Sequence, residues 1–138
     1  MAACPDLGLS LKHWDEARRL IEGKNFANLA TLMPDGSPQV TPVWVDHEGE
    51  MILVNTAEGR VKIKNVTLDP RVALSIFDQA DPYRKVVIRG RVIEITKVGA
   101  EDHIDKMAMK YRGLAKYPWR QPGISRVLIK LKPSAIST

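Results

Sequence analysis

The residues that could do chemistry gather in one short segment, NTAEGRVKIKN (residues 55–65), where three cations alternate with aliphatic side chains. Arg60 has a planar guanidinium that can hold a phosphate through two parallel hydrogen bonds, and Lys62 and Lys64 add point charges. The small residues before Arg60 allow a ligand to approach the backbone closely. The segment therefore suits an anion such as phosphate, although a solvated basic surface has the same composition.

The rest of the chain shows no recognisable catalytic group, and no catalytic residue is predicted. His13, His47 and His103 have no partner histidine or cysteine at metal-ligand spacing, so no metal site is expected. Ser37 and Ser75 do not stand in a strand–turn–helix nucleophile motif. This pattern is typical of enzymes in which a bound cofactor carries the reaction and the protein supplies binding and orientation.

Composition and charge narrow the class of protein. The 138 residues are 44% hydrophobic and 27% charged, as expected for one globular domain spanning residues 1–138. A net charge of +5 favours anionic partners. No apolar run approaches the roughly 20 residues of a membrane span, and no signal peptide is expected at the N-terminus. Cys4 is the only cysteine, so an intrachain disulfide is impossible and a reducing cytoplasm is expected.

The elements that must position these cations follow from hydrophobic periodicity. A helix is expected from about Leu11 to Glu22, with Ser10 as its N-cap, and a second helix at about 100–112. Pro34 and Gly36 predict a type I turn with a bulge between the first two strands. Six strands are expected, at Phe26–Leu32, Pro38–Asp46, Met51–Asn55, Arg71–Phe77, Lys85–Thr96 and Ile124–Lys132. The fold class is therefore mainly β with α additions, as an antiparallel barrel or closed sheet.

Three local features refine this scheme. Residues Arg60–Leu68 suit a short helix or an extended segment equally well, and Gly90 predicts a bulge or sharp bend in the fifth strand. Pro42 removes a backbone donor, so its strand lies at an edge or is locally open. Backbone left unpaired there could hydrogen-bond a flat, polar-edged ligand such as a flavin ring, or Pro42 simply marks a barrel corner.

Three segments in this order resemble a known family: FANLATLMPDGSPQVTPVWVD, LVNTAEGRVKIKNVTLDPRVALSIFD and DPYRKVVIRGRVIEI. From about Phe26 to Pro133 the chain is similar to the split-β-barrel flavin and deazaflavin oxidoreductases of the pyridoxamine 5′-phosphate oxidase superfamily. Within it the pattern looks most like the F420-dependent branch. The resemblance implies a six-stranded antiparallel split β-barrel of the FMN-binding type. It also implies a homodimer with two cofactor sites in the grooves between subunits.

The resemblance further implies three groups of cofactor contacts. Those expected to border the ring are Gln39, Val40, Thr41 and Pro42. Those expected along the phosphate-bearing chain are Asn55, Thr56, Ala57, Arg60, Lys62, Lys64 and Asn65, with Arg60 and Lys62 clamping the phosphate. Those expected to reach the partner's cofactor are Phe77, Asp78 and Tyr83.

The implied activity is hydride transfer between F420 and an organic acceptor, commonly an activated double bond. Such transfer requires close positioning of donor and acceptor carbons rather than a nucleophile. FMN is the alternative cofactor, and a non-enzymatic flavin or tetrapyrrole binder is the alternative class. Nucleic acid is not expected as a partner, because the three cations have aliphatic rather than aromatic neighbours.

Overall fold

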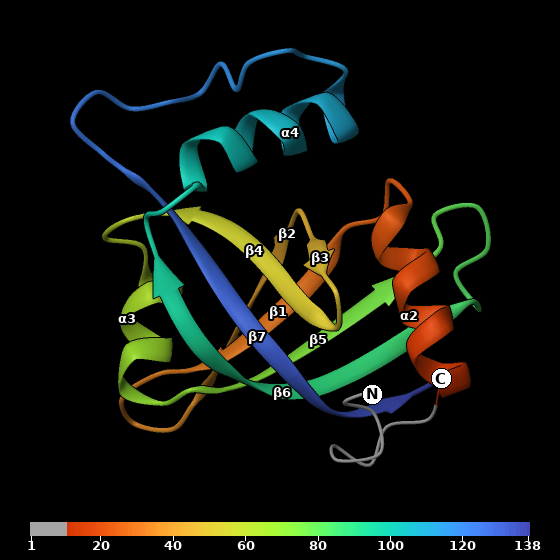
Figure 1. Ribbon diagram of the computed structural model, residues 1–138. Coiled ribbons are helices and arrows are strands. Elements are labelled where there is room, and N and C mark those ends of the chain that lie inside the picture. Colours follow the sequence, from red (N-terminus) through yellow and green to blue (C-terminus); the bar gives the residue numbers. More distant parts are fainter. Residues whose placement is uncertain (1–10) are drawn as a thin grey trace.

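The computed structural model describes residues 11–138, with side chains from residue 13 onward, and is shown in Figure 1. The expected roles of Cys4 and Ser10 lie outside the described residues. The helices are α2 (Leu11–Glu22), α3 (Val61–Leu68) and α4 (Ala100–Arg112). The strands are β1 (Ala27–Leu32), β2 (Pro38–Val43), β3 (Asp46–Glu48), β4 (Met51–Ala57), β5 (Arg71–Phe77), β6 (Lys85–Thr96) and β7 (Arg126–Ser137).

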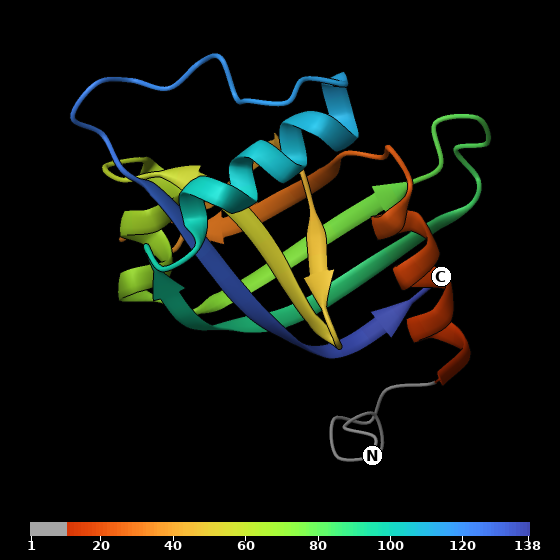
Figure 2. The same ribbon diagram turned by 45° about the horizontal axis from the view of Figure 1, so that its top comes forward.

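The strands form one strongly curved sheet in the order β2-β1-β5-β6-β7-β4-β3, and every neighbouring pair is antiparallel (Figure 2). Its two edges in the described chain are β2 and β3, so the expected closed sheet is not formed. The chain passes from one edge to the other within the two residues Trp44 and Val45, because β2 pairs with β1 whereas β3 pairs with β4. Pro42 therefore lies on an edge strand, as its missing N–H predicted.

The predicted count of six strands is wrong, because the sheet has seven. The additional strand, β3, has only three residues, too few to show an alternating pattern in the sequence. The second strand consequently ends at Val43 rather than at Asp46. The last strand continues past Lys132 to Ser137, because Pro133 pairs with Gly90 where the ladder is irregular and tolerates a missing donor.

Two glycines act as the sequence predicts. The register of β6 against β7 shifts between Arg89 and Gly90, and a Cβ at Gly90 would lie 2.4 Å from the carbonyl oxygen of Lys132. Gly36 has φ +86°, and its N–H donates to Met33 O at 2.8 Å to close the turn between β1 and β2. Both positions require a residue without a side chain.

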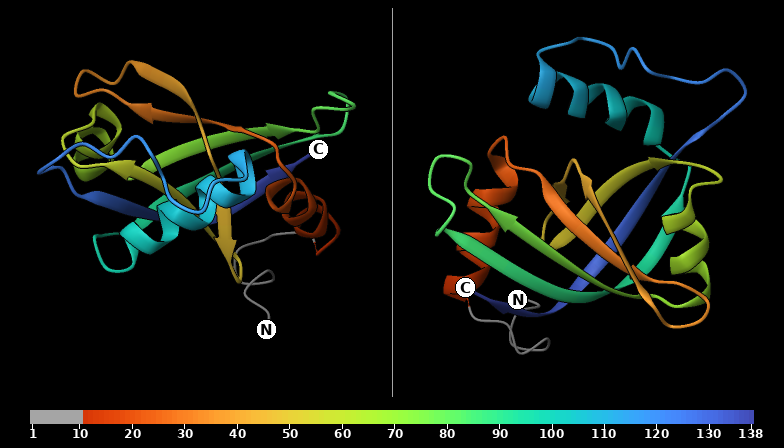
Figure 3. Two further views of the ribbon diagram at one scale, coloured as in Figure 1. Left: turned by 90° about the horizontal axis from the view of Figure 1, so that it is seen from above. Right: turned by 180° about the vertical axis from the view of Figure 1, so that it is seen from behind.

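The core lies inside the curve of the sheet, where α2 and α3 pack against it, whereas α4 covers the other face of β4 and β7 through Ala100, Leu53 and Leu128 (Figure 3). Helix α2 packs into the core through Trp14, Ala17, Leu20 and Ile21, the stripe predicted from its spacing. Each fully buried leucine or isoleucine contributes about 1.5–3 kcal/mol, so these contacts hold the helix far more firmly than its intrinsic propensity.

The segment left open between helix and strand is a helix, α3. Its Val66 is buried, Ile63 packs against the core, and Asn65 is buried beside β1. The i, i+3 spacing of Ile63 and Val66 places both side chains on one helical face, which an extended chain could not do. Arg60 therefore stands at the N-cap of α3, and Lys62 lies in its first turn.

Candidate functional site

The site lies where β4 ends, α3 begins and β7 starts. Gly59, with φ +83°, turns the chain from β4 into α3 and brings Arg60 and Lys62 beside the end of the sheet. Arg126, the first residue of β7, pairs there with Ala57. A cavity of about 230 Å³ opens between them. It is lined by Phe26, Pro42, Val43, Trp44, Asn55, Thr56, Ala57, Arg60, Lys62, Ile104, Tyr117, Trp119 and Arg126.

The charges in this cavity are of one sign. Within residues 11–138, neither Arg60 nor Lys62 forms a side-chain hydrogen bond or an ion pair with a carboxylate. Lys62 is half-buried, and this burial lowers the pKa of its ammonium, with Arg60 and Arg126 lowering it further by repulsion. Burial likewise lowers the pKa of Arg126, and Arg60 adds to that effect. An anion in the cavity would offset the burial and the repulsion that disfavour the charged forms of Lys62 and Arg126.

The beginning of α3 adds a second contribution of the same sign. The first backbone N–H groups of a helix have no partner within it, and no side chain caps them here. The helix dipole makes this end positive, so cations at Arg60 and Lys62 are unfavourable unless an anion joins them. Free N–H groups and cations at one helix end are the arrangement that binds phosphate in many proteins.

Arg126 is held in a defined orientation. Its Nε donates to Asn55 Oδ1 at 3.0 Å, and its guanidinium lies over the ring of Tyr117, 4.9 Å from the centroid. Its backbone N–H donates to a carboxylate oxygen of Glu101 at 2.8 Å. The side chain is therefore preorganised toward the cavity before any ligand arrives.

Aromatic side chains form one wall of the cavity. Trp44 stacks on Tyr111 at a centroid distance of 5.1 Å and meets Tyr117 edge-on at 6.1 Å. Tyr111 donates to Asn25 O at 2.8 Å and accepts from Val45 N–H at 3.1 Å, while burial raises its pKa to about 12. Tyr111 is therefore a fixed support, and it holds the Trp44 ring in place beside the cavity.

The loop 113–125 supplies Tyr117 and Trp119 and is tied to α4 by charge. Asp105 accepts from Tyr117 N–H at 2.8 Å and from Arg120 at 2.9 Å, and Arg120 also reaches Glu101 at 3.0 Å. The hydrogen bonds from Arg120 and from the Tyr117 backbone lower the pKa of Asp105 to about 2. These bonds place the two aromatic rings over the cavity.

The structure brings together six of the predicted cofactor residues, all of which line the cavity: Pro42, Asn55, Thr56, Ala57, Arg60 and Lys62. Other predicted residues lie apart from it. The side chain of Asn65 is buried and donates to Thr31 Oγ1 at 2.9 Å, and Lys64 is exposed on α3. Gln39, Val40 and Thr41 lie on β2 but do not line the cavity.

The last three predicted residues lie at the other end of the sheet. Phe77 ends β5, and Asp78 and Tyr83 follow in the hairpin before β6, beside α2 and away from α3 (Figure 1). Asp78 pairs with Arg84 at 3.5 Å, and Tyr83 is 89% exposed. Within one chain they cannot reach the cavity, so their predicted role depends on a second copy.

Sequence reasoning missed Arg126 as a cation of the site. Its place depends on the pairing of β7 with β4, which joins residues far apart in the chain. Trp44 and Trp119 also line the cavity, whereas Met107 is buried and Met109 is exposed. The only local signal for Arg126 was its position at the start of an apolar strand.

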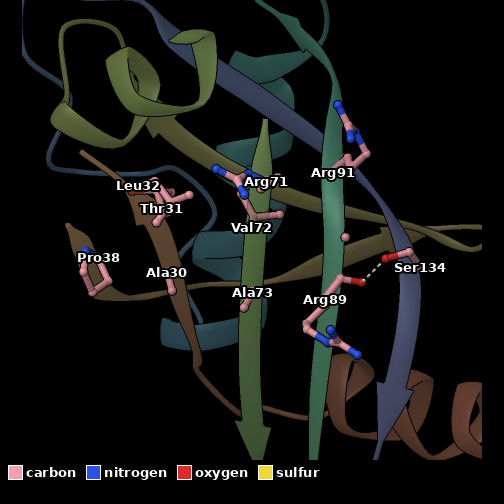
Figure 4. A pocket seen from close by; sticks show the side chains of 11 residues that line it. Ala30, Thr31, Leu32, Pro38, Arg71, Val72, Ala73, Arg89, Arg91 and Ser134 are labelled. Carbon is pink, nitrogen blue, oxygen red and sulfur yellow. Dashed lines mark hydrogen bonds between the residues drawn. The ribbon is translucent and has the colours of Figure 1, made fainter. Parts of the chain in front are cut away.

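A larger cavity, of about 440 Å³, opens on the outer face of the sheet where β6 bends (Figure 4). Its floor is made of small residues, Ala30, Ala73 and Gly90, and arginines 71, 89 and 91 surround it. Arg71 is neutralised by Asp69 at 2.7 Å. The lining contains no aromatic residue and no helix terminus, so this cavity has less of the equipment expected for a planar anionic ligand.

Comparison with known proteins places the chain in a family. The family described as pyridoxamine 5'-phosphate oxidase matches residues 14–138. The chain belongs to the pyridoxamine 5'-phosphate oxidase family. Among solved structures, it is 31% identical to an F420 reductase with a TM-score of 0.76, over 87% of this chain and 94% of that one.

More distant family-like structures share the fold alone. General Stress Protein 26 from Bacillus anthracis is 18% identical, with a TM-score of 0.62 over 89% of this chain and 90% of that one. The heme storage protein from Vibrio cholerae is 13% identical, with a TM-score of 0.64 over 90% and 92%. One fold thus serves proteins with different names, so function must be argued from the cavity.

Two further observations concern the described part of the chain. None of its helices is both long and apolar enough to cross a membrane. Residues 11–138 also contain no group of three or more His, Cys, Asp or Glu side chains close enough to hold a metal ion.

Proposed function

We propose that this protein is an oxidoreductase that binds coenzyme F420 in the cavity at the start of α3 and transfers a hydride between it and an organic acceptor. The observation that carries the proposal is the cluster of Arg60, Lys62 and Arg126, in which the first two have no carboxylate partner among the described residues. The likeness to an F420 reductase at 31% identity supports the choice of cofactor. The acceptor expected is a compound with an activated double bond.

The residues of the cavity fit the two parts of such a cofactor. Arg60, Lys62 and the first N–H groups of α3 would hold the phosphate, and Arg126 would neutralise it from the side of β7. Trp44, Tyr117 and the edge strand around Pro42 would border the flat ring. When bound, the deazaflavin ring supplies the hydride.

The protein's own contribution is then orientation and exclusion of water. Trp44 and Tyr117 are fixed by stacking and by the loop that Asp105 anchors, so the ring would meet a rigid surface. A fixed donor ring and a fixed acceptor carbon supply most of what hydride transfer requires. The proton that completes reduction of a double bond would come from solvent or from Tyr117, whose ring lines the cavity.

FMN is the second candidate cofactor, because it shares with F420 a tricyclic ring, a ribityl chain and a phosphate. The net charge of +5 favours F420, which also carries an acidic oligoglutamate tail. A family member of this kind would work in the cytoplasm, as the single cysteine suggests.

Titration of the purified protein with F420 and with FMN tests the proposal. We expect F420 to bind much more tightly than FMN, and the Arg60→Ala, Lys62→Ala double variant to lose most of this affinity. Arg18→Ala is the matched control, because it removes one exposed cation on α2 that pairs with Asp15 and Glu22. Tight binding of FMN with no binding of F420 would show that FMN is the cofactor. Binding of neither compound would reject the proposal.

We also propose that the protein acts as a homodimer in which a second copy covers the outer face of the sheet. Small and apolar side chains face outward there beside arginines 71, 89 and 91, with Val40 62% exposed and Val87 42% exposed. The partner would bring its hairpin with Phe77 and Tyr83 toward the cavity. Sedimentation should show a dimer that Ala73→Glu dissociates, and a monomeric wild-type protein would contradict this arrangement.

A further inference from the structure

A chain of hydrogen bonds runs from β3 through α4 and β4 to the cavity. Asp46 Oδ2 lies 3.1 Å from His103 Nε2, and His103 Nδ1 lies 3.1 Å from Asn55 Nδ2. Asn55 Nδ2 also donates to Ala100 O at 2.8 Å, and Asn55 Oδ1 accepts from Arg126 Nε at 3.0 Å. A histidine outside the cavity is thereby connected to one of its three cations.

The two ends of this series of hydrogen bonds determine which atom donates and which accepts at each step. Ala100 O can only accept and Arg126 Nε can only donate, so the amide of Asn55 has one possible orientation, with Nδ2 toward Ala100. Because that Nδ2 also faces His103 Nδ1, this ring nitrogen must be the acceptor and carry no proton. The proton of a neutral His103 is then on Nε2 and donates to Asp46.

We propose that His103, as the neutral Nε2–H tautomer, is a positioning residue for the anion site: it orients Asn55, which holds the guanidinium of Arg126 at the cavity. The inference rests on the proposed function for its consequence, because Arg126 matters only if an anion binds there. His103 itself does not line the cavity and would touch neither cofactor nor substrate.

Protonation of His103 would break this chain. An imidazolium carries N–H groups on both nitrogens, so Nδ1–H would face the NH₂ group of Asn55, donor against donor. Turning the amide over would remove that conflict but create two others, with Ala100 O facing an oxygen and Arg126 Nε–H facing an NH₂ group. In the flipped orientation Arg126 loses its partner, and in the original orientation the donor–donor repulsion displaces the amide that holds Arg126, so either way its preorganisation is reduced.

The groups around His103 come from several elements. Asp46, His47 and Glu48 lie on β3, Lys106 on α4, and Lys130 on β7, and all line a cavity of about 320 Å³ with His103. Burial raises the pKa of Asp46, but hydrogen bonds from His103, the His47 backbone and Lys106 together hold it well below its usual range. Asp46 therefore stays a carboxylate at any pH at which an imidazole gains a proton, and Lys106 lies 3.1 Å from it.

This coupling predicts that protonation of His103 changes the affinity for an anion in an unusual direction. A positive charge added by protonating His103 would strengthen the binding of an anion by simple Coulomb attraction. Loss of the Asn55–Arg126 hydrogen bond would weaken it by about tenfold, the scale of one hydrogen bond to a charged group. We therefore expect affinity for F420 to fall, not rise, as His103 becomes protonated.

Two variants distinguish the roles of the two ring nitrogens of His103. In His103→Asn the side-chain oxygen can take the place of Nδ1 and accept from Asn55, whereas His103→Gln places its amide near the position of Nε2 and loses that acceptor. We expect His103→Asn to bind F420 nearly as well as wild type and His103→Gln to bind it about tenfold more weakly. His47→Gln is the control, because His47 also pairs with a carboxylate, Glu22 at 2.8 Å, but has no connection to Arg126.

Nitrogen-15 NMR of the ligand-free protein tests the chain independently of any cofactor. We expect the neutral Nε2–H tautomer at His103 and a protected Arg126 Nε–H signal that is retained in His103→Asn, lost in His103→Gln, and lost in wild type as His103 is protonated. The Nδ1–H tautomer, or an Arg126 signal indifferent to His103, would overturn the proposal. If these signals behave as expected but neither F420 nor FMN binds the wild type, the positioning chain stands and the proposed function fails.

A purely structural histidine gives a different result. It would lower stability in both variants alike and would leave the affinity of the folded protein for F420 unchanged. Equal F420 affinity in His103→Asn, His103→Gln and wild type, or tighter binding at the pH where His103 is protonated, would therefore refute the positioning role. The pH titration of the wild type keeps the test decisive even if His103→Gln does not fold.

Discussion

Two clusters of cations, one in the loop 113–125 and one at the start of α3, differ in what neutralises them. Arg120 contacts both Glu101 and Asp105, and Lys116 lies 3.5 Å from Asp105. Arg60 and Lys62, at the start of α3, have no carboxylate partner in the part of the chain that the structure describes. Both clusters are rich in arginine and lysine, so residue type alone does not distinguish them.

Pairing with carboxylates separates the charges that hold the fold together from those that are available to bind a ligand. A cation paired with a carboxylate ties one segment of chain to another, as Arg120 ties the loop to α4. A half-buried cation beside a like charge, as Lys62 is beside Arg60, lowers stability until an anion arrives. Arg126 lies between the two, with its backbone bonded to Glu101 and its side chain directed to the unpaired cluster.

The largest effect is expected from the unpaired cluster. Arg60→Ala or Lys62→Ala should each weaken cofactor binding by about 1–3 kcal/mol, the cost of a lost charged hydrogen bond. The free energy of unfolding without ligand should stay the same or rise, because repulsion at the start of α3 is relieved. Cofactor titration and chemical denaturation measure the two quantities. Unchanged affinity in both variants would mean that the segment is a solvated basic surface and not a ligand site.

The paired cluster should respond in the opposite way. Arg120→Ala should lower the free energy of unfolding by up to about 1 kcal/mol, since its ion pairs are partly exposed and form a small network. Loop 113–125 should become more mobile, which NMR relaxation of its amides would show. Cofactor affinity should fall less than in Lys62→Ala. An affinity loss equal to that of Lys62→Ala would show that the comparison is wrong.

Acid should release the same loop. The pKa of Asp105 is lowered from 3.8 to about 2, chiefly by Arg120 and then by the Tyr117 backbone. Because the folded-state pKa is the lower one, this contribution to stability is fully present above 3.8 and is lost as the pH falls through about 2. Hydrogen exchange of the loop amides should accelerate, relative to the core, over that interval. Asp105→Asn should already lack the stabilisation at neutral pH and show no such transition.

The smallest effect is expected at Lys64. It is the third cation of the alternating segment, but it is exposed on α3 and does not line the cavity. Lys64→Ala should change cofactor affinity by less than about 0.5 kcal/mol, because an exposed charge at this range is largely screened by salt. A loss as large as that of Lys62→Ala, measured by the same titration, would mean that the bound anion extends along the helix.

Much of the secondary structure could be predicted because it follows from periodicity. The bounds expected for α2, β5 and β6 agree with the structure, and so do the bulge at Gly90 and the edge position of Pro42. The three-residue β3 could not be found, because so short a strand has no period of its own. The choice between helix and strand at α3 depended on burial of Val66 and Asn65, which is a tertiary fact.

The site was predictable only where it is contiguous in sequence. Thr56, Ala57, Arg60 and Lys62 lie within one short segment, and they do line one cavity. Arg126 and the His103–Asn55 chain come from pairing and packing between distant segments, to which no local pattern points. Partner-chain contacts expected of Phe77 and Tyr83 stay predictions for the same reason.

The bend at Gly90 has a consequence for the distant cavity. Strand β7 begins at Arg126 and later crosses β6 closely at Gly90, so the bend and that guanidinium belong to the same strand. One methyl group at residue 90 would act as a wedge between the strands, because it would meet the Lys132 carbonyl oxygen at 2.4 Å. We therefore expect a side chain at residue 90 to alter the site from outside it, through the geometry of the sheet alone.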